Sequence, residues 1–276
     1  MSDRILEIDD VTLQFGNIVA LESIRMSVRE GELLSIIGPN GAGKTSLFNC
    51  ISGVYRPRSG EIRLDGLKLS ALAPHAIAKA GIARTFQNVE VFPNMTVLDN
   101  LLLGCNQRMR AGVLACCAFW GRAIREETEQ RLVVEEIIEF LEIEHLRREP
   151  VGALPHGLQK RVELGRALAM QPRVLLLDEP VAGMNQEETE DIVRFILDVR
   201  EELEITIVLV EHDMGVVMDV SDTVAVLDFG RLIACGPPAE VAADPAVISA
   251  YLGGGDWAPQ ATVDRASGFP LPAGSR

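Results

Sequence analysis

A glycine-rich segment that contains one lysine and ends on hydroxyl residues carries the strongest chemical signal in the sequence. Residues 38–45, here termed the phosphate loop, match GxxxxGK[ST], and a serine follows: Gly38, Pro39, Asn40, Gly41, Ala42, Gly43, Lys44, Thr45 and Ser46. Glycines let successive backbone N–H groups face phosphate oxygens, and a helix beginning here adds the positive end of its dipole. The pattern predicts a site for ATP and Mg²⁺, with Lys44 on the phosphates and Thr45 on the metal.

Two adjacent carboxylates, Asp178 and Glu179, directly follow a short apolar run at 174–177. A buried strand that ends in this way delivers its acids to the sheet edge where ligands bind in open α/β folds. Asp178 suits the coordination shell of Mg²⁺. Glu179 suits a general base that orients and polarises the attacking water. A solvated acidic turn is the alternative for the pair taken alone, and the phosphate loop favours ATP hydrolysis instead.

Two further side chains carry weaker signals. His212 follows the β-branched run 205–210, and its ring could donate to a γ-phosphate or hold the water and Glu179 in place. Capping of the strand end is the alternative for this histidine. The amide of Gln87 could reach both Mg²⁺ and the water, although a single glutamine in a loop indicates little by itself.

These residues need a scaffold, and the sequence predicts an α/β fold. Alternating apolar and polar residues over the first thirty positions predict antiparallel strands, and 61–64 resembles an edge strand before the Asp65-Gly66 turn. The apolar run 33–37 predicts a buried parallel strand leading into the phosphate loop. Further strands are expected at 174–177, 206–210, 223–228 and 231–235, and helices at 44–52, 156–169 and 186–202, with two short helical segments ending near Leu252.

The periodicity also divides the chain into regions. A single domain over 1–252 is expected, with a β/α core at 1–90 and 165–252 and a helical insert at 91–164. Within the insert, residues 125–144 place charged residues on one side and four apolar ones on the other: Leu132, Ile137, Ile138 and Leu141. The Gly, Pro, Ala and Ser content of residues 253–276 predicts a disordered tail.

Composition excludes several classes of protein. The formal net charge of −14 argues against a nucleic-acid partner, because phosphate backbones select basic surfaces. The first residues show neither the basic start nor the apolar stretch of a secretory signal, and no apolar run is long enough to span a bilayer. The five cysteines lack CxxC spacing, so reduced thiols in a cytosolic protein are expected.

The order and spacing of these motifs resemble those of the ATPase subunits of ABC transporters over about residues 4–252. The resemblance implies a P-loop NTPase cassette, with a mixed β core, an N-terminal antiparallel β subdomain and an inserted helical subdomain. It also implies that Phe15 stacks on adenine, with core packing as the alternative. By the same resemblance, Gly157 is expected to lie in the signature segment, which in this family closes over the ATP of a second subunit.

The signature segment departs from the family pattern. The family usually has LSGGQ, whereas residues 154–159 read LPHGLQ, with Pro155 in place of the serine. A subfamily variant that relies on Gly157 and backbone N–H groups is one interpretation, and a degenerate site is the other. The first is favoured because the lysine, both acids and the histidine are all present.

Within this family, residues 13–16, 83–88, 178–185 and 211–214 are similar to the ATP-binding subunits of branched-chain amino acid importers of the LivG type. That resemblance implies a peripheral subunit on the cytoplasmic face of the inner membrane, held there by transmembrane permease subunits. A second ABC ATPase subunit, either a copy or a paralogue, would complete a nucleotide-sandwich dimer. A periplasmic or surface substrate-binding protein would deliver the cargo.

Three alternatives to import remain open at this point: an ABC export ATPase of the lipopolysaccharide type, an ABC ATPase without a transport role, and a non-catalytic regulatory cassette. The helical insert is the expected docking face for the permeases. Its apolar segment 112–120 is too short to span a bilayer and is expected to pack on the insert or on a partner.

Overall fold

The computed structural model describes residues 3–85, 90–105 and 122–252, except for the side chains of 122–126. Three predictions therefore lie outside the described residues: the role of Gln87, the packing of segment 112–120, and the disorder of the tail at 253–276. They remain predictions.

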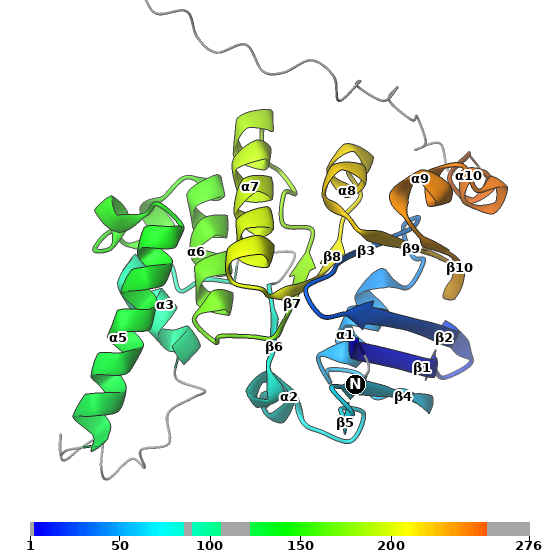
Figure 1. Ribbon diagram of the computed structural model, residues 1–276, viewed down its shortest axis with the longest axis horizontal. Helices are drawn as coiled ribbons and strands as arrows, with labels where there is room; N and C mark the ends of the chain where they lie inside the picture. The colour runs from blue at the N-terminus through cyan, green and yellow to red at the C-terminus, as the bar shows by residue number, and fades with distance from the viewer. Residues whose placement is uncertain (1–2, 86–89, 106–121, 253–276) are drawn as a thin grey trace, which may run out of the picture.

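A six-stranded sheet forms the centre of the molecule, in the order β10-β9-β3-β8-β7-β6 (Figure 1). Its strands run parallel except for β10, which pairs antiparallel with β9. The carboxyl ends of β3, β7 and β8 consequently share one edge, where the phosphate loop, the two acids and the histidine follow these strands. The bounds are β3 Leu33–Ile37, β6 Ile82–Arg84, β7 Val174–Asp178, β8 Thr206–Val210, β9 Thr223–Asp228 and β10 Arg231–Gly236.

A second, antiparallel sheet has the order β2-β1-β4-β5. The prediction that 61–64 is an edge strand is wrong, because β5 pairs with the far side of β4. The connecting residues Asp65 and Gly66 both have positive φ, at 47° and 77°, as a tight hairpin turn requires. The strands of this sheet are β1 Arg4–Phe15, β2 Ile18–Arg29, β4 Ser59–Leu64 and β5 Leu67–Lys68.

The helices gather around the central sheet, and α3, α5 and α6 lie together at one end of the molecule (Figure 1). The sequence did not indicate α2, α8 or the short strand β6, which have seven, seven and three residues. The helices are α1 Lys44–Ile51, α2 Pro74–Ala80, α3 Val97–Cys105, α5 Arg122–Phe140, α6 His156–Leu168, α7 Gln186–Glu202, α8 Met214–Val220, α9 Pro238–Ala242 and α10 Pro245–Leu252.

Side chains of the central strands alternate between two cores. Leu175 and Leu177 of β7 pack with α3, α5, α6 and α7 on one face of the sheet. Val174 and Leu176 pack with α1 and the antiparallel sheet on the other face. The alternation follows from the two-residue period of a strand. Helices α1 and α6 therefore cover opposite faces of the sheet.

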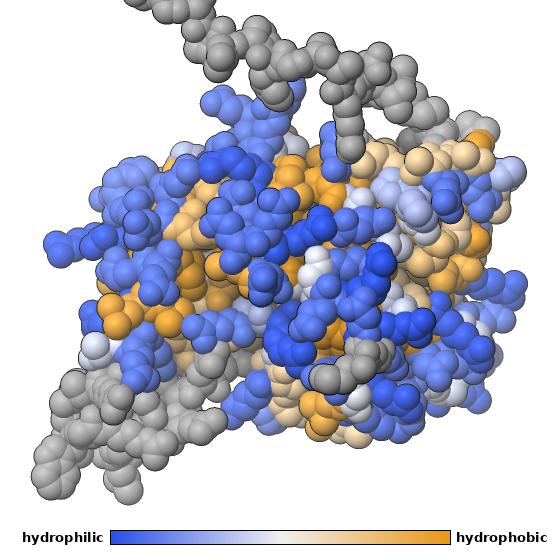
Figure 2. Space-filling model, in the orientation of Figure 1, coloured by the Kyte–Doolittle hydropathy of each residue, from blue (hydrophilic) through white to orange (hydrophobic). Residues whose placement is uncertain are grey.

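One of the four residues predicted for the apolar side of segment 125–144, Leu132, does not lie on its buried side. Leu132 is 60% exposed, whereas Val134, Ile138 and Leu141 are buried. Leu132 was assigned to the apolar side by its type alone, but α3 and α6 cover a narrower stripe of α5. Elsewhere, hydrophilic side chains cover most of the face drawn in Figure 2, with apolar ones visible between them.

Candidate nucleotide site

The phosphate loop connects β3 to α1 and depends on its glycines for its path. Gly38 has φ +147°, and a Cβ there would lie 2.1 Å from the carbonyl oxygen of Leu227. Gly43 has φ +106°, and a Cβ there would lie 2.9 Å from the carbonyl oxygen of Ala20. Because any side chain would collide with backbone, the loop can pack this closely only with glycine at both positions.

Lys44 begins α1, and its side chain folds back over the loop. Its Nζ donates to the carbonyl oxygens of Gly38 at 2.6 Å and Pro39 at 3.2 Å. Burial lowers the pKa of Lys44, while the nearby charges of Glu179 and Asp178 act to raise it. The ammonium group is thus held between the loop and the two acids, where a triphosphate would supply stronger acceptors than the carbonyl groups.

The first turn of α1 offers open donors beside this lysine. Gly43 is the N-cap residue and provides no side-chain hydrogen bond, and the first turn contains no acid. Thr45 is exposed and Ser46 is half-buried. A helix start with this character favours an anion.

Asp178 ends β7 and is held by a buried arginine. Its Oδ2 accepts a hydrogen bond of 2.7 Å from the Arg84 guanidinium, and the two side chains are 5% and 9% exposed. Arg84 also donates to Oδ1 of Asn49 on α1, at 2.6 Å. This arginine therefore joins the phosphate-loop helix to the strand that carries the acids. Sequence reasoning assigned it no role, although a charged residue ending the otherwise apolar Ile-Ala-Arg strand was a usable signal.

Glu179 adopts an uncommon backbone conformation. Its φ is +50°, and its N–H donates to the carbonyl oxygen of Val210 on β8 at 2.8 Å. A non-glycine residue in this region is sparsely populated and costs of order 1 kcal/mol or more, so surrounding contacts must hold it there. Seven other non-glycine residues among those described also have positive φ, so the catalytic role of Glu179 remains a prediction.

His212 leaves β8 beside these acids. In the sheet, Asp178 lies opposite Val210, so the acid pair and the histidine emerge from neighbouring strands at the same edge. The imidazole is 65% exposed, and its Nδ1 lies 3.6 Å from Oε2 of the buried Glu211. The ring is therefore accessible to a ligand at this edge.

Two further candidate residues come from the family resemblance. The Phe15 ring is 46% exposed and meets Tyr55 edge-on, with ring centroids 5.0 Å apart. It is not packed in the core, which is contrary to the alternative interpretation of this residue. Gly157 lies in the first turn of α6, where a Cβ would come within 2.8 Å of Oε1 of Glu188. Because α6 covers the opposite face of the sheet from α1, one chain does not place Gly157 with Lys44.

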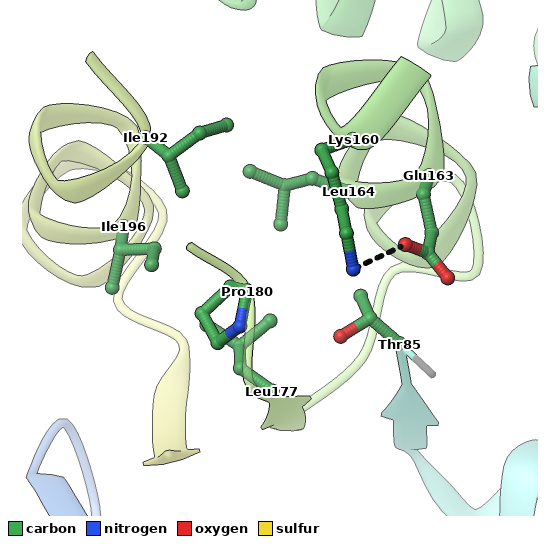
Figure 3. A pocket seen from close by; sticks show the side chains of 8 residues that line it. All are labelled: Thr85, Lys160, Glu163, Leu164, Leu177, Pro180, Ile192 and Ile196. Atoms are coloured by element: carbon green, nitrogen blue, oxygen red, sulfur yellow. Dashed lines mark ion pairs between the residues drawn. The ribbon is translucent and has the colours of Figure 1, made fainter. Parts of the chain in front are cut away.

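A small cavity between α6, α7 and the end of β7 is a separate feature (Figure 3). Its volume is about 10 Å³, which is room for about one water molecule and not for a nucleotide. Lys160 and Glu163 of α6 form an ion pair there at 3.5 Å, and both side chains are buried. Thr85, Leu177 and Pro180 line the same cavity, so a buried ion pair of α6 lies beside the residues around the end of β7.

The donor set fits a nucleotide with its magnesium ion. Loop N–H groups and an ammonium group suit phosphate oxygens, while a hydroxyl and a carboxylate suit a hard cation. Among the described residues, no three His, Cys, Asp or Glu side chains form a metal-holding group on their own.

Comparisons with known proteins define the class. The family model described as ABC transporter matches residues 21–182, and that of the branched-chain amino acid ATP-binding cassette transporter matches residues 231–256. The chain therefore belongs to the ATP-binding cassette proteins of ABC transporters, in agreement with the resemblance and fold class expected from the sequence. No described helix is long and apolar enough to cross a membrane.

Individual relatives make the assignment narrower. The chain is 40% identical to BraF of Pseudomonas aeruginosa, a high-affinity branched-chain amino acid transport ATP-binding protein, over 92% of this chain and 99% of that protein. It is also 40% identical to LivG of Salmonella typhimurium, a protein of the same description, with the same coverage.

Solved structures agree with this result. The ADP conformation of MJ1267, an ATP-binding cassette of an ABC transporter, has a TM-score of 0.80 at 33% identity and covers 91% of this chain and 100% of that one. The cassette MJ0796 forms a dimer bound to ADP and Pi, with a TM-score of 0.70 at 26% identity over 85% and 99% of the two chains.

Proposed function

We propose that this chain is the ATP-hydrolysing subunit that powers an ABC importer for branched-chain amino acids or related small polar compounds. The observation that carries the proposal is the position of the Lys44 ammonium, on the phosphate loop and within the electrostatic influence of Asp178 and Glu179. The chain's similarity to BraF and LivG over nearly their whole length supports the cargo class.

In the proposed site, Lys44 and the loop N–H groups bind the β- and γ-phosphates. Thr45, Asp178 and the amide of Gln87 would hold Mg²⁺, which would supply positive charge to neutralise the phosphate oxygens. Glu179 accepts a proton from the attacking water and aligns it with the γ-phosphorus. His212, exposed at the same edge, steadies the γ-phosphate and the water.

A second ATPase subunit completes the site. The exposed ring of Phe15 stacks on adenine from the same chain, while Gly157 and the first turn of α6 close over the ATP bound to the partner. The dimeric state of the cassette MJ0796 with ADP and Pi supports the pairing of two such subunits. ATP then shifts an open–closed equilibrium because it binds the closed dimer better, and hydrolysis removes that preference.

The partners follow from the importer assignment. The helical insert at 91–164 docks on transmembrane permease subunits, which hold the chain at the cytoplasmic face of the inner membrane. A substrate-binding protein outside the membrane supplies the cargo. Co-purification of the full-length chain with its permeases, followed by ATP-dependent uptake of leucine into proteoliposomes, tests this part of the proposal. If leucine is not taken up but another small polar solute is, that solute replaces branched-chain amino acids as the proposed cargo.

The nucleotide site is tested by Lys44→Ala. Loss of a charge-assisted contact to the phosphates is expected to weaken ATP affinity by about 10- to 100-fold. Equilibrium binding of a fluorescent ATP analogue to the purified chain measures this change, together with phosphate release. Lys79→Ala removes an exposed lysine of α2 and serves as the charge-matched control. Equal affinities of the Lys44→Ala and Lys79→Ala proteins would contradict the proposed site.

A further inference from the structure

A fully buried carboxylate contacts the backbone next to each of the two side chains proposed for catalysis. Glu211 is 1% exposed and occupies the residue between the end of β8 and His212. We propose that Glu211 is a positioning residue that fixes the backbone on both sides of the reaction centre, at Glu179 and at His212. This inference rests on the proposed ATPase function and deepens it.

The two oxygens of this carboxylate bind different segments. Oε1 accepts from the N–H of Val181 at 3.2 Å, in the segment that follows Glu179. Oε2 accepts from the N–H of His212 at 3.0 Å and lies 3.5 Å from the N–H of Asp213. One rigid side chain therefore joins the loop after β7 to the loop after β8.

These bonds explain how Glu179 is kept in its uncommon conformation. The Glu179 N–H is held by the carbonyl oxygen of Val210 at 2.8 Å, and the Val181 N–H is held by Glu211. Pro180, between them, has no N–H to offer. The residue with φ +50° is thus fastened on each side, to β8 by the sheet and to the histidine segment by Glu211.

The burial of the Glu211 carboxyl group and its backbone hydrogen bonds indicate that this residue holds the two loops together. Burial raises the pKa of the Glu211 carboxyl group, while the N–H groups of Val181 and His212 act to lower it. A buried acid held by backbone amides is a costly way to fill space, since an apolar side chain of similar size would avoid the desolvation. Its acceptor oxygens provide what an apolar side chain cannot, a joint connection to Val181 and His212.

Glu211→Gln tests the proposal, because the amide keeps the size of the side chain but turns one acceptor into a donor. A donor would then face an N–H group, and one of the two loops would lose its anchor. In the full-length chain, kcat for ATP hydrolysis is expected to fall by about 10- to 100-fold, as for a small misplacement of catalytic groups. KM for ATP is expected to stay unchanged, because the phosphate loop is not involved.

A spectroscopic measurement tests the same bonds without turnover. The ¹⁵N and ¹H amide signals of Val181 and His212 are expected to move in Glu211→Gln, as is the imidazole signal of His212. The chain has four histidines, so the His212→Ala variant assigns that ring signal. Unmoved Val181 and His212 signals in folded Glu211→Gln protein would overturn the proposal.

Glu32→Gln is the matched control. Glu32 is 6% exposed and accepts from the N–H of Arg29 at 2.6 Å, so it is also a buried acid that binds backbone. It directly precedes β3, at the other end of that strand from the phosphate loop. Its loss is expected to lower stability and leave kcat unchanged. A loss of kcat as large as that of Glu211→Gln would show a general stability effect and overturn the proposal.

A double-mutant cycle with His212→Ala separates the effect that Glu211 has through His212 from the effect that it has through Val181. If Glu211 acts partly through the histidine, the combined variant loses less activity than the product of the two single losses. Fully multiplicative losses of kcat with wild-type KM would contradict the part of the proposal in which Glu211 acts through His212. A wild-type chain that binds and hydrolyses no ATP would contradict the proposed function itself, whereas the amide signals would still report the Glu211 contacts.

Discussion

Glu179→Gln is expected to lower ATP turnover by about two to four orders of magnitude, which is the usual contribution of a general base. The substitution keeps the size of the side chain and the backbone bond to Val210, but a neutral amide cannot take the proton of the attacking water. Binding of ATP through Lys44 remains, so the variant is expected to accumulate as an ATP-bound dimer. Phosphate release and size-exclusion chromatography with ATP measure the two effects.

The structure offers an unusually close control for this variant. Glu204 is an exposed glutamate with φ +53°, located between α7 and β8, so Glu204→Gln makes the same change in the same backbone conformation. It is expected to retain wild-type turnover. If the Glu179→Gln variant also hydrolyses ATP at the wild-type rate, Glu179 is not the general base.

Arg84→Gln is expected to lower the free energy of unfolding by about 3–5 kcal/mol, the usual cost of leaving a buried charge without its partner. Asp178 would lose its 2.7 Å contact with the guanidinium while remaining 5% exposed. The link to Asn49 on α1 would also be lost. Urea unfolding of the nucleotide-free chain measures this change. Arg84→Gln combined with Asp178→Asn is expected to recover part of the loss, because both charges are then absent.

An exposed ion pair of similar length is the control. Arg231 contacts Glu22 at 2.8 Å, with the two side chains 65% and 47% exposed. Arg231→Gln is expected to change stability little, because solvent screens such pairs. If Arg84→Gln and Arg231→Gln unfold at the same urea concentration, burial does not strengthen the Arg84–Asp178 pair, and the role given to Arg84 is wrong.

The parts of the site that were predictable from sequence are those formed by consecutive residues. The phosphate loop and the Asp178-Glu179 pair each lie within a few positions, so residue type and spacing indicate their chemistry. Their roles remain predictions that the variants above test. The parallel strands before them were predictable for the same reason, because continuous apolar runs mark buried strands.

The connections between segments were not predictable. Arg84 and Asp178 are 94 residues apart, and Val181 and Glu211 are 30 apart, so only the pairing of β6, β7 and β8 brings them together. Nothing in the local sequence distinguishes Glu211 from an exposed acid in a turn. Leu132 shows the opposite error, since its apolar side chain suggested a core position that neighbouring helices leave uncovered.

Placement of α1 and α6 on opposite faces of the central sheet has a consequence for the unusual signature segment. Under the proposed dimer, Pro155 and Gly157 of this chain act in trans on the nucleotide held by the other subunit. If that subunit is a paralogue, the two composite sites are chemically unequal. Pro155→Ser would then alter the hydrolysis rate at one site of the pair and leave intact the site that contains Lys44 of this chain.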